Sequence, residues 1–150
     1  MNVEPTQETG ILLVSHGACC EGLLDTLTMV AGEQDGVCAL PLAEGMDPDV
    51  YREQIERWLE PYGENALILI DVLGGTPFNQ VMRIGKNRLV HAVTGMSVPM
   101  ALEAVVMRAS MTPAELVEHL CATAATSVQS VESLLAALGS SDDDDEDEED

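Results

Sequence analysis

Two polar side chains that could act together each follow a short apolar run. His16 comes after GILLVS, and Asp71 comes after ALILI. A carboxylate beside a histidine can accept the N–H at ring atom Nδ1, which fixes the tautomer and leaves Nε2 as a directed lone pair. A nucleophilic histidine needs this arrangement. If the two runs are neighbouring strands, His16 and Asp71 form a candidate catalytic pair.

The segments next to this pair are suited to holding a phosphoryl group. Asp71 is followed by VLGGTP, in which two glycines allow close backbone approach and Thr76 with Pro77 is typical of a helix cap and first turn. A helix N-terminus favours anions, and a second helix is expected soon after His16. Neither loop contains lysine or arginine. The sequence therefore predicts one phosphoryl group carried on a side chain, held by the backbone of Gly17, Gly74 and Gly75.

Other chemistries lack their motifs. The chain has no Walker loop for a nucleotide triphosphate, and SHGACCEG does not match the dinucleotide fingerprint. Asp71 could be a phosphate acceptor or a magnesium ligand, but residues 11–17 supply no further acids. No cysteine pair has zinc-ligand spacing, and we expect neither a metal nor a cofactor. His91 and His119, inside a predicted strand and helix, are interpreted as structural or surface residues.

The elements that must position the pair alternate along the chain. Apolar runs at 11–14, 37–42, 66–70 and 89–93 are typical of buried strands, and helical spacing separates them. Asp47, Ser97 and Thr112 are predicted helix caps, and a helical pattern continues from Leu116 to Leu138. These features predict a three-layer α/β/α, doubly wound fold with a mainly parallel four-stranded sheet. Ligands bind such sheets at the carboxyl ends of the strands, where the strand order reverses.

Composition limits the function classes further. The 150 residues carry a formal net charge of −21, and residues 142–150 are all acidic. This charge argues against nucleic-acid binding and against binding to an anionic membrane surface. No signal peptide or membrane-spanning run is visible, so we expect a cytoplasmic protein with reduced thiols. We predict a flexible leader at 1–9, one domain at 10–139 and a disordered acidic tail at 140–150.

Four sequence blocks, in order, resemble the enzyme IIA component of the mannose-family sugar phosphotransferase system (PTS). They are GILLVSHGxxxxGLL, GEQ at 32–34, LILIDVLGGTPFN and VTGMSVPM, and the resemblance covers residues 10–108. It implies that His16 accepts phosphate from the phosphocarrier HPr and donates it to a histidine on enzyme IIB, which serves the membrane subunits IIC and IID. It also implies that Asp71 orients His16 and that Thr76 contacts the phosphoryl group.

Two further expectations follow from the resemblance. Family members are dimers that exchange a fifth strand, although no run after Val93 has strand character in this chain. The apolar segment from Leu116 to Leu138 also exceeds what one small sheet needs as cover, which favours a homodimer.

The alternative function is the phosphocarrier subunit of a PTS-dependent dihydroxyacetone kinase, whose members generally lack the block around Asp71. No IIB domain is recognised, so IIB is expected on a separate chain. The protein itself is expected to be cytoplasmic and able to associate peripherally with the membrane transporter complex.

Overall fold

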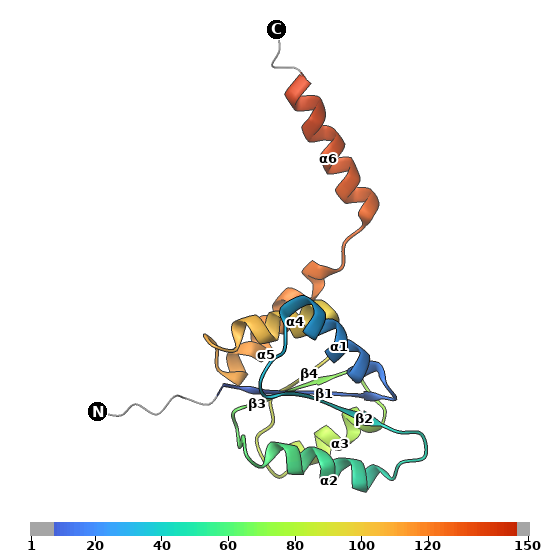
Figure 1. Cartoon of the computed structure of the whole chain (residues 1–150), viewed down its shortest axis with the longest axis vertical. Helices are drawn as coiled ribbons and strands as arrows, with labels where there is room; N and C mark the ends of the chain where they lie inside the picture. The colour runs from blue at the N-terminus through green and yellow to red at the C-terminus, as the bar shows by residue number, and fades with distance from the viewer. Residues whose placement is uncertain (1–7, 147–150) are drawn as a thin grey trace, which may run out of the picture.

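The computed structural model describes residues 8–146, with side chains described up to residue 140, and its body is a sheet between two helical layers (Figure 1). All four strands are parallel and are arranged in the order β2-β1-β3-β4. Their bounds are β1 Gly10–His16, β2 Val37–Leu42, β3 Ala66–Ile70 and β4 Ala92–Thr94. The predicted fold class is therefore confirmed, and the described residues form no fifth strand.

Helices cover both faces of this sheet. The bounds are α1 Cys19–Ala31, α2 Pro48–Leu59, α3 Thr76–Gly85, α4 Val98–Met107, α5 Pro113–Thr123, the 3-10 turn η1 Ala124–Ser127 and α6 Val131–Glu146. Helices α1, α4 and α5 lie on one face, and α2 and α3 lie on the other, whereas α6 extends away from the body (Figure 1). The two covered faces explain why β1 and β3 carry runs of consecutive apolar residues rather than apolar residues at alternate positions.

Alternation within β1 divides the core into two hydrophobic clusters. Ile11 and Leu13 pack in the cluster that includes α1, α4 and α5, whereas Leu12 and Val14 pack in the cluster that includes α2 and α3. All four side chains are fully buried. A register shift of one residue would move each of them into the opposite layer, so burial on both faces fixes how β1 pairs with its neighbours.

Three predicted helix caps are confirmed. The side chain of Asp47 accepts hydrogen bonds from the first turn of α2, that of Ser97 from α4 and that of Thr112 from α5. Pro41 lies inside β2, although proline cannot donate to a strand neighbour. The strand tolerates it because β2 is at the edge of the sheet and pairs only with β1.

The fourth strand and the C-terminal helix differ from the predictions. The strand predicted at 89–93 is β4 at Ala92–Thr94, and the exposed Leu89 lies in the segment before it. The continuous helical pattern up to Leu138 is broken after α5 by η1, and α6 begins only after Ser130, whose hydroxyl accepts from the Ser133 N–H. Serine competes with the helix by bonding the backbone locally, so the apolar spacing alone missed this break.

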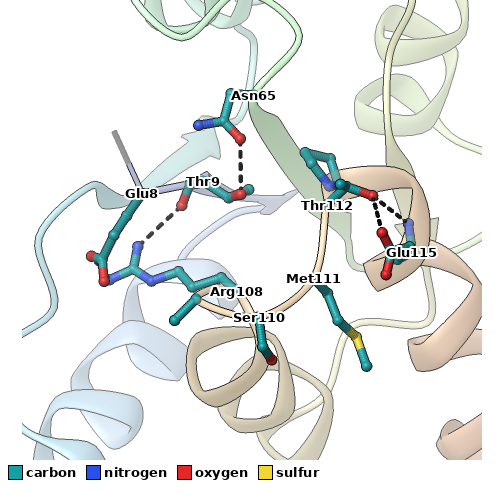
Figure 2. A pocket seen from close by; sticks show the side chains of 10 residues that line it. Glu8, Thr9, Asn65, Arg108, Ser110, Met111, Thr112 and Glu115 are labelled. Atoms are coloured by element: carbon teal, nitrogen blue, oxygen red, sulfur yellow. Dashed lines mark hydrogen bonds and ion pairs between the residues drawn. The ribbon is translucent and has the colours of Figure 1, made fainter. Parts of the chain in front are cut away.

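Both predicted flexible ends fall partly outside the described residues. Residues 1–7 and 147–150 are not described, and the backbone of 141–146 forms the end of α6, so the predicted leader and tail stay predictions. Thr9 is buried, and the buried Arg108 guanidinium donates to its carbonyl oxygen at 3.1 Å (Figure 2). Arg108 also donates to the Asp35 carbonyl and pairs with Glu8 at 3.1 Å. The start of β1 is therefore held to the end of α4.

Candidate active site

The predicted pair lies where the order of the strands reverses. From β1 the chain crosses to β2 on one side and later returns to β3 on the other, so β1 and β3 flank the switch point. His16 is the last residue of β1, and Asp71 directly follows β3. The parallel pairing of Val14 with Ile70 brings the two residues to the same edge of the sheet. This is the edge at which open α/β sheets bind ligands.

The Asp71 carboxylate holds both the ring and the backbone of His16. Oxygen Oδ2 lies 2.8 Å from ring atom Nδ1 and accepts the His16 main-chain N–H at 3.0 Å. Oxygen Oδ1 accepts the Val72 N–H at 2.9 Å. An ionised carboxylate can only accept, so Nδ1 carries the proton and Nε2 of the neutral ring keeps its lone pair. The His16 side chain is 49% exposed and that of Asp71 15%, so the imidazole is accessible from solvent.

Gly75 packs its backbone against the outer edge of the imidazole. A Cβ placed on Gly75 would lie 2.7 Å from His16 Cε1 and 2.9 Å from Nε2, closer than real contacts allow. Its φ of +85° also falls in the left-handed region, which favours glycine. The sequence predicts Thr76 as the cap of the next helix, but the structure places the cap at Gly75 and makes Thr76 the first helical residue. The α3 N-terminus therefore begins beside Nε2.

The other predicted site residues divide into two groups. Thr76 and Gly74 lie in the same turn as Gly75, and Thr76 is half-buried. Gly17 follows His16, but its N–H donates to the Leu42 carbonyl at 2.9 Å. The Gly17 amide therefore ties the loop to β2, and the role of the Gly17 backbone in holding a phosphoryl group stays a prediction. A φ of +57° at Gly17 makes this turn possible.

A buried tyrosine that the sequence analysis did not consider interacts electrostatically with Asp71. Tyr51 of α2 is fully buried and donates its hydroxyl to the Leu40 carbonyl at 2.7 Å. Burial is the main cause that raises the pKa of Tyr51 above its ordinary value, with the thiol of Cys20 and the carboxylate of Asp71 adding to it. The hydroxyl stays neutral at physiological pH and serves as a hydrogen-bond donor, not as an acid.

The two other histidines lie away from this edge of the sheet. His119 of α5 bonds the Glu103 carboxylate of α4 at 2.6 Å through Nε2, joining two helices. His91 precedes β4, and its carbonyl accepts the Ile68 N–H at 2.9 Å. Within the described residues, no group of three or more His, Cys, Asp or Glu side chains is arranged to hold a metal. Of the three histidines, His16 is the one whose ring bonds a carboxylate at the carboxyl ends of the strands.

Known proteins share this arrangement of sequence and fold. Residues 10–121 match the family model described as the PTS system fructose IIA component. The chain is 25% identical over 120 residues to the fructose-specific EIIA component of Bacillus subtilis, covering 78% of this chain and 82% of that protein. It is 31% identical over 101 residues to the mannose-specific EIIAB component of Escherichia coli, covering 65% of this chain and 31% of that protein.

This chain belongs to the mannose/fructose/sorbose family of PTS EIIA components. A solved EIIA structure from Streptococcus agalactiae has a TM-score of 0.78 with it at 26% identity, covering 83% of this chain and 98% of that chain. The PTS IIA protein associated with a fucose utilization operon of Streptococcus pneumoniae has a TM-score of 0.74 at 27% identity, covering 84% and 95%. The family resemblance found in the sequence is therefore confirmed.

Membership assigns this EIIA component to phosphoryl transfer in sugar uptake. In the described part of the chain, no helix combines the length and the apolar character needed to cross a membrane. A hollow of about 590 Å³ lies beside Arg108 and Thr112, at the amino ends of the strands and away from His16 (Figure 2). Arg108 already bonds several oxygens there, so the hollow adds nothing to the His16 site.

Placing a methyl group between the helix cap and the imidazole should disturb the EIIA site. Gly75→Ala would press on His16 Nε2, so we expect a displaced ring and a weakened bond from Nδ1–H to Asp71. Nuclear magnetic resonance of the His16 ring nitrogens measures this. Gly45→Ala is the matched control, because Gly45 has a φ of +78° but no atom near its added Cβ. Both variants should lose about 1 kcal/mol of stability, and identical His16 spectra would contradict the close contact.

Proposed function

We propose that His16 carries the phosphoryl group of this EIIA component, accepting it from phospho-HPr and donating it to a histidine of enzyme IIB. The observation that supports this most directly is the 2.8 Å bond between Nδ1 and Asp71 Oδ2. The bond directs the lone pair of Nε2 toward solvent beside the α3 N-terminus. A partly exposed nucleophile with a fixed tautomer suits transfer between two proteins, since each partner must reach the same atom.

The transfer exchanges one nitrogen–phosphorus bond for another. The Nε2 lone pair of His16 attacks the phosphorus of phosphohistidine on HPr, and the bond to the HPr imidazole breaks as that ring takes the electron pair. The proton stays on Nδ1 and is hydrogen-bonded to Asp71, whose carboxylate stabilises the positive charge that develops on the His16 ring. Donation to the IIB histidine follows the same path in reverse, with His16 as the leaving group.

The phosphoryl oxygens would be held by backbone and hydroxyl groups rather than by cations. Gly75 packs against Nε2, Gly74 lies in the same turn, and Thr76 opens α3. N–H groups in the first turn of a helix lack intrahelical partners and favour anions. The loop residues 71–79 contain no lysine or arginine. We expect hydrogen bonds from neutral groups to hold the phosphoryl group weakly enough for its transfer to IIB.

The partners follow from the same proposal. HPr and IIB would dock in turn at the edge of the sheet that carries His16, and the membrane subunits IIC and IID would be reached only through IIB. We expect a cytoplasmic protein that associates peripherally with the transporter. The acidic charge of −21 supports protein partners over nucleic acid.

Removal of His16 should abolish phosphorylation. We expect the wild-type chain, incubated with enzyme I, HPr and phosphoenolpyruvate, to gain one phosphoryl group on His16, and His16→Ala to gain none. His91→Ala and His119→Ala are the controls and should be labelled normally. Mass spectrometry at neutral to alkaline pH locates the label. A labelled His16→Ala would contradict the proposal. Chasing the label with IIB, or with the ADP-bound subunit of dihydroxyacetone kinase, identifies the acceptor.

Neutralising the orienting carboxylate should slow the transfer without unfolding the protein. Asp71→Asn keeps a hydrogen-bonding side chain but cannot stabilise charge on the ring or enforce the tautomer. We expect transfer from phospho-HPr and to IIB to slow by about one or more orders of magnitude, with an unchanged thermal midpoint. Asp47→Asn, an acid-to-amide change at the α2 cap, should leave the rates unchanged. Equal rates for both variants would make Asp71 merely structural.

An exposed apolar stripe supports a homodimer. Helix α6 and the residue that follows η1 present side chains that are about half exposed or more: Val128, Val131, Leu134, Leu135 and Leu138. These side chains stay exposed in the described part of the chain, and α6 extends away from the body (Figure 1). An apolar groove of about 330 Å³ beside edge strand β4, lined in part by Val81, Met82 and Val90, is large enough to receive side chains from a second copy. We expect the two surfaces to meet between copies.

Light scattering during size-exclusion chromatography tests the dimer. The full chain should have twice the monomer mass, because burying the stripe removes apolar surface from water. Leu135→Asp with Leu138→Asp should give a monomer. Met29→Asp with Val30→Asp, which alters two exposed apolar residues at the end of α1, should leave the dimer intact. A monomer mass for the unaltered chain at working concentrations would contradict this part of the proposal.

A further inference from the structure

Ser15 is a fully buried hydroxyl residue beside the nucleophile. It precedes His16 in β1, and its Oγ forms two hydrogen bonds across the loop that follows the strand. Oγ accepts the N–H of Cys20 at 2.8 Å and donates to the carbonyl of Gly17 at 2.9 Å. The hydroxyl therefore links the end of β1 both to the loop residue Gly17 and to Cys20 in the first turn of α1.

This hydroxyl acts as the side-chain cap that α1 otherwise lacks. The residue at the cap position is Ala18, which has no side-chain oxygen, and Cys20 is the second residue of the helix. Its N–H is buried and would have no partner within the helix. Because Ser15 caps the helix from five residues upstream, the end of β1 and the start of α1 cannot move independently.

Two sets of hydrogen bonds, called clamps here, hold His16 and the loop that follows it. On the β3 side, Asp71 binds the ring and the backbone N–H of His16, and its own N–H donates to the Val14 carbonyl at 3.1 Å. On the α1 side, Ser15 holds the carbonyl of Gly17 and the first turn of the helix. The first clamp sets the tautomer and the second sets the position of the loop relative to α1.

We propose that Ser15 is a positioning residue for phosphoryl transfer: its hydroxyl aligns the His16 loop and the α1 N-terminus around the phosphoryl group without touching it. The inference rests on the proposed role of His16. Misplacing a reacting atom by about 1 Å can cost on the order of a hundredfold in rate. Losing this alignment should therefore lower the rate of phosphoryl transfer within the complex with phospho-HPr. The affinity for phospho-HPr should be unchanged, since Ser15 is fully buried and offers no surface to a docking protein.

The test compares Ser15 variants with a matched change at the other end of β1. Ser15→Ala removes both bonds, Ser15→Cys keeps the size with a weaker donor and acceptor, and Ser15→Thr keeps the hydroxyl. Thr9→Val is the control, because Thr9 is also buried and donates one side-chain bond, to Asn65 Oδ1 at 2.9 Å. Thermal midpoints identify a temperature at which all the variants being compared are folded.

We expect Ser15→Ala to lower kcat for transfer from phospho-HPr by about tenfold or more with KM unchanged, and Ser15→Cys to fall between it and the wild type. Ser15→Thr should restore kcat, and Thr9→Val should keep the wild-type kcat despite a lower midpoint. A kcat that follows stability and not the hydroxyl would overturn the inference, and the cysteine variant decides it if the alanine variant does not fold. Full-speed Ser15→Ala with label on His16 defeats this inference alone, whereas a wild-type chain without label on His16 defeats the proposed function.

Discussion

The parallel pairing of β1 with β3 is the constraint on which the site depends. Val14 lies opposite Ile70, so β1 extends past the end of β3 just far enough for His16 to meet the side chain of Asp71. The main chain reinforces this register, because the Asp71 N–H donates to the Val14 carbonyl and the His16 N–H donates to the Asp71 carboxylate. A slip of one residue would bury the wrong face of each strand and separate the pair.

The burial of apolar strands between two helical layers accounts both for the fold and for the position of the candidate site. Strands with consecutive apolar residues must be covered on both faces, and helices that cover them return the chain to the same edge after each crossover. This edge receives the end of β1, the loop after β3 and the N-termini of α1 and α3. In the proposed function, backbone N–H groups at the helix N-termini supply the positive character that a phosphoryl group needs in loops without lysine or arginine.

Two details of the site were not visible in the sequence because they depend on distant contacts. Gly75 abuts the His16 ring, so the helix cap lies one residue earlier than the Thr76–Pro77 signal suggests. The Gly17 amide bonds Leu42 of β2 and is unavailable to a ligand. The role of Ser15 could not be predicted either, because a small polar residue at a strand end gives no sign that it binds the N–H of Cys20 in the next helix.

The sequence by itself determined the layers, the strand-to-helix alternation, the caps at Asp47, Ser97 and Thr112, and the candidate pair of His16 with Asp71. Local signals suffice for these features, because apolar spacing and capping side chains act within a few residues. Only the tertiary structure decided the order of the strands, the bond between Nδ1 and Asp71, the close approach of Gly75 and the end of the helical pattern after α5. Each of these depends on which segments meet across the sheet or on how the backbone bonds locally, and neither is encoded in periodicity.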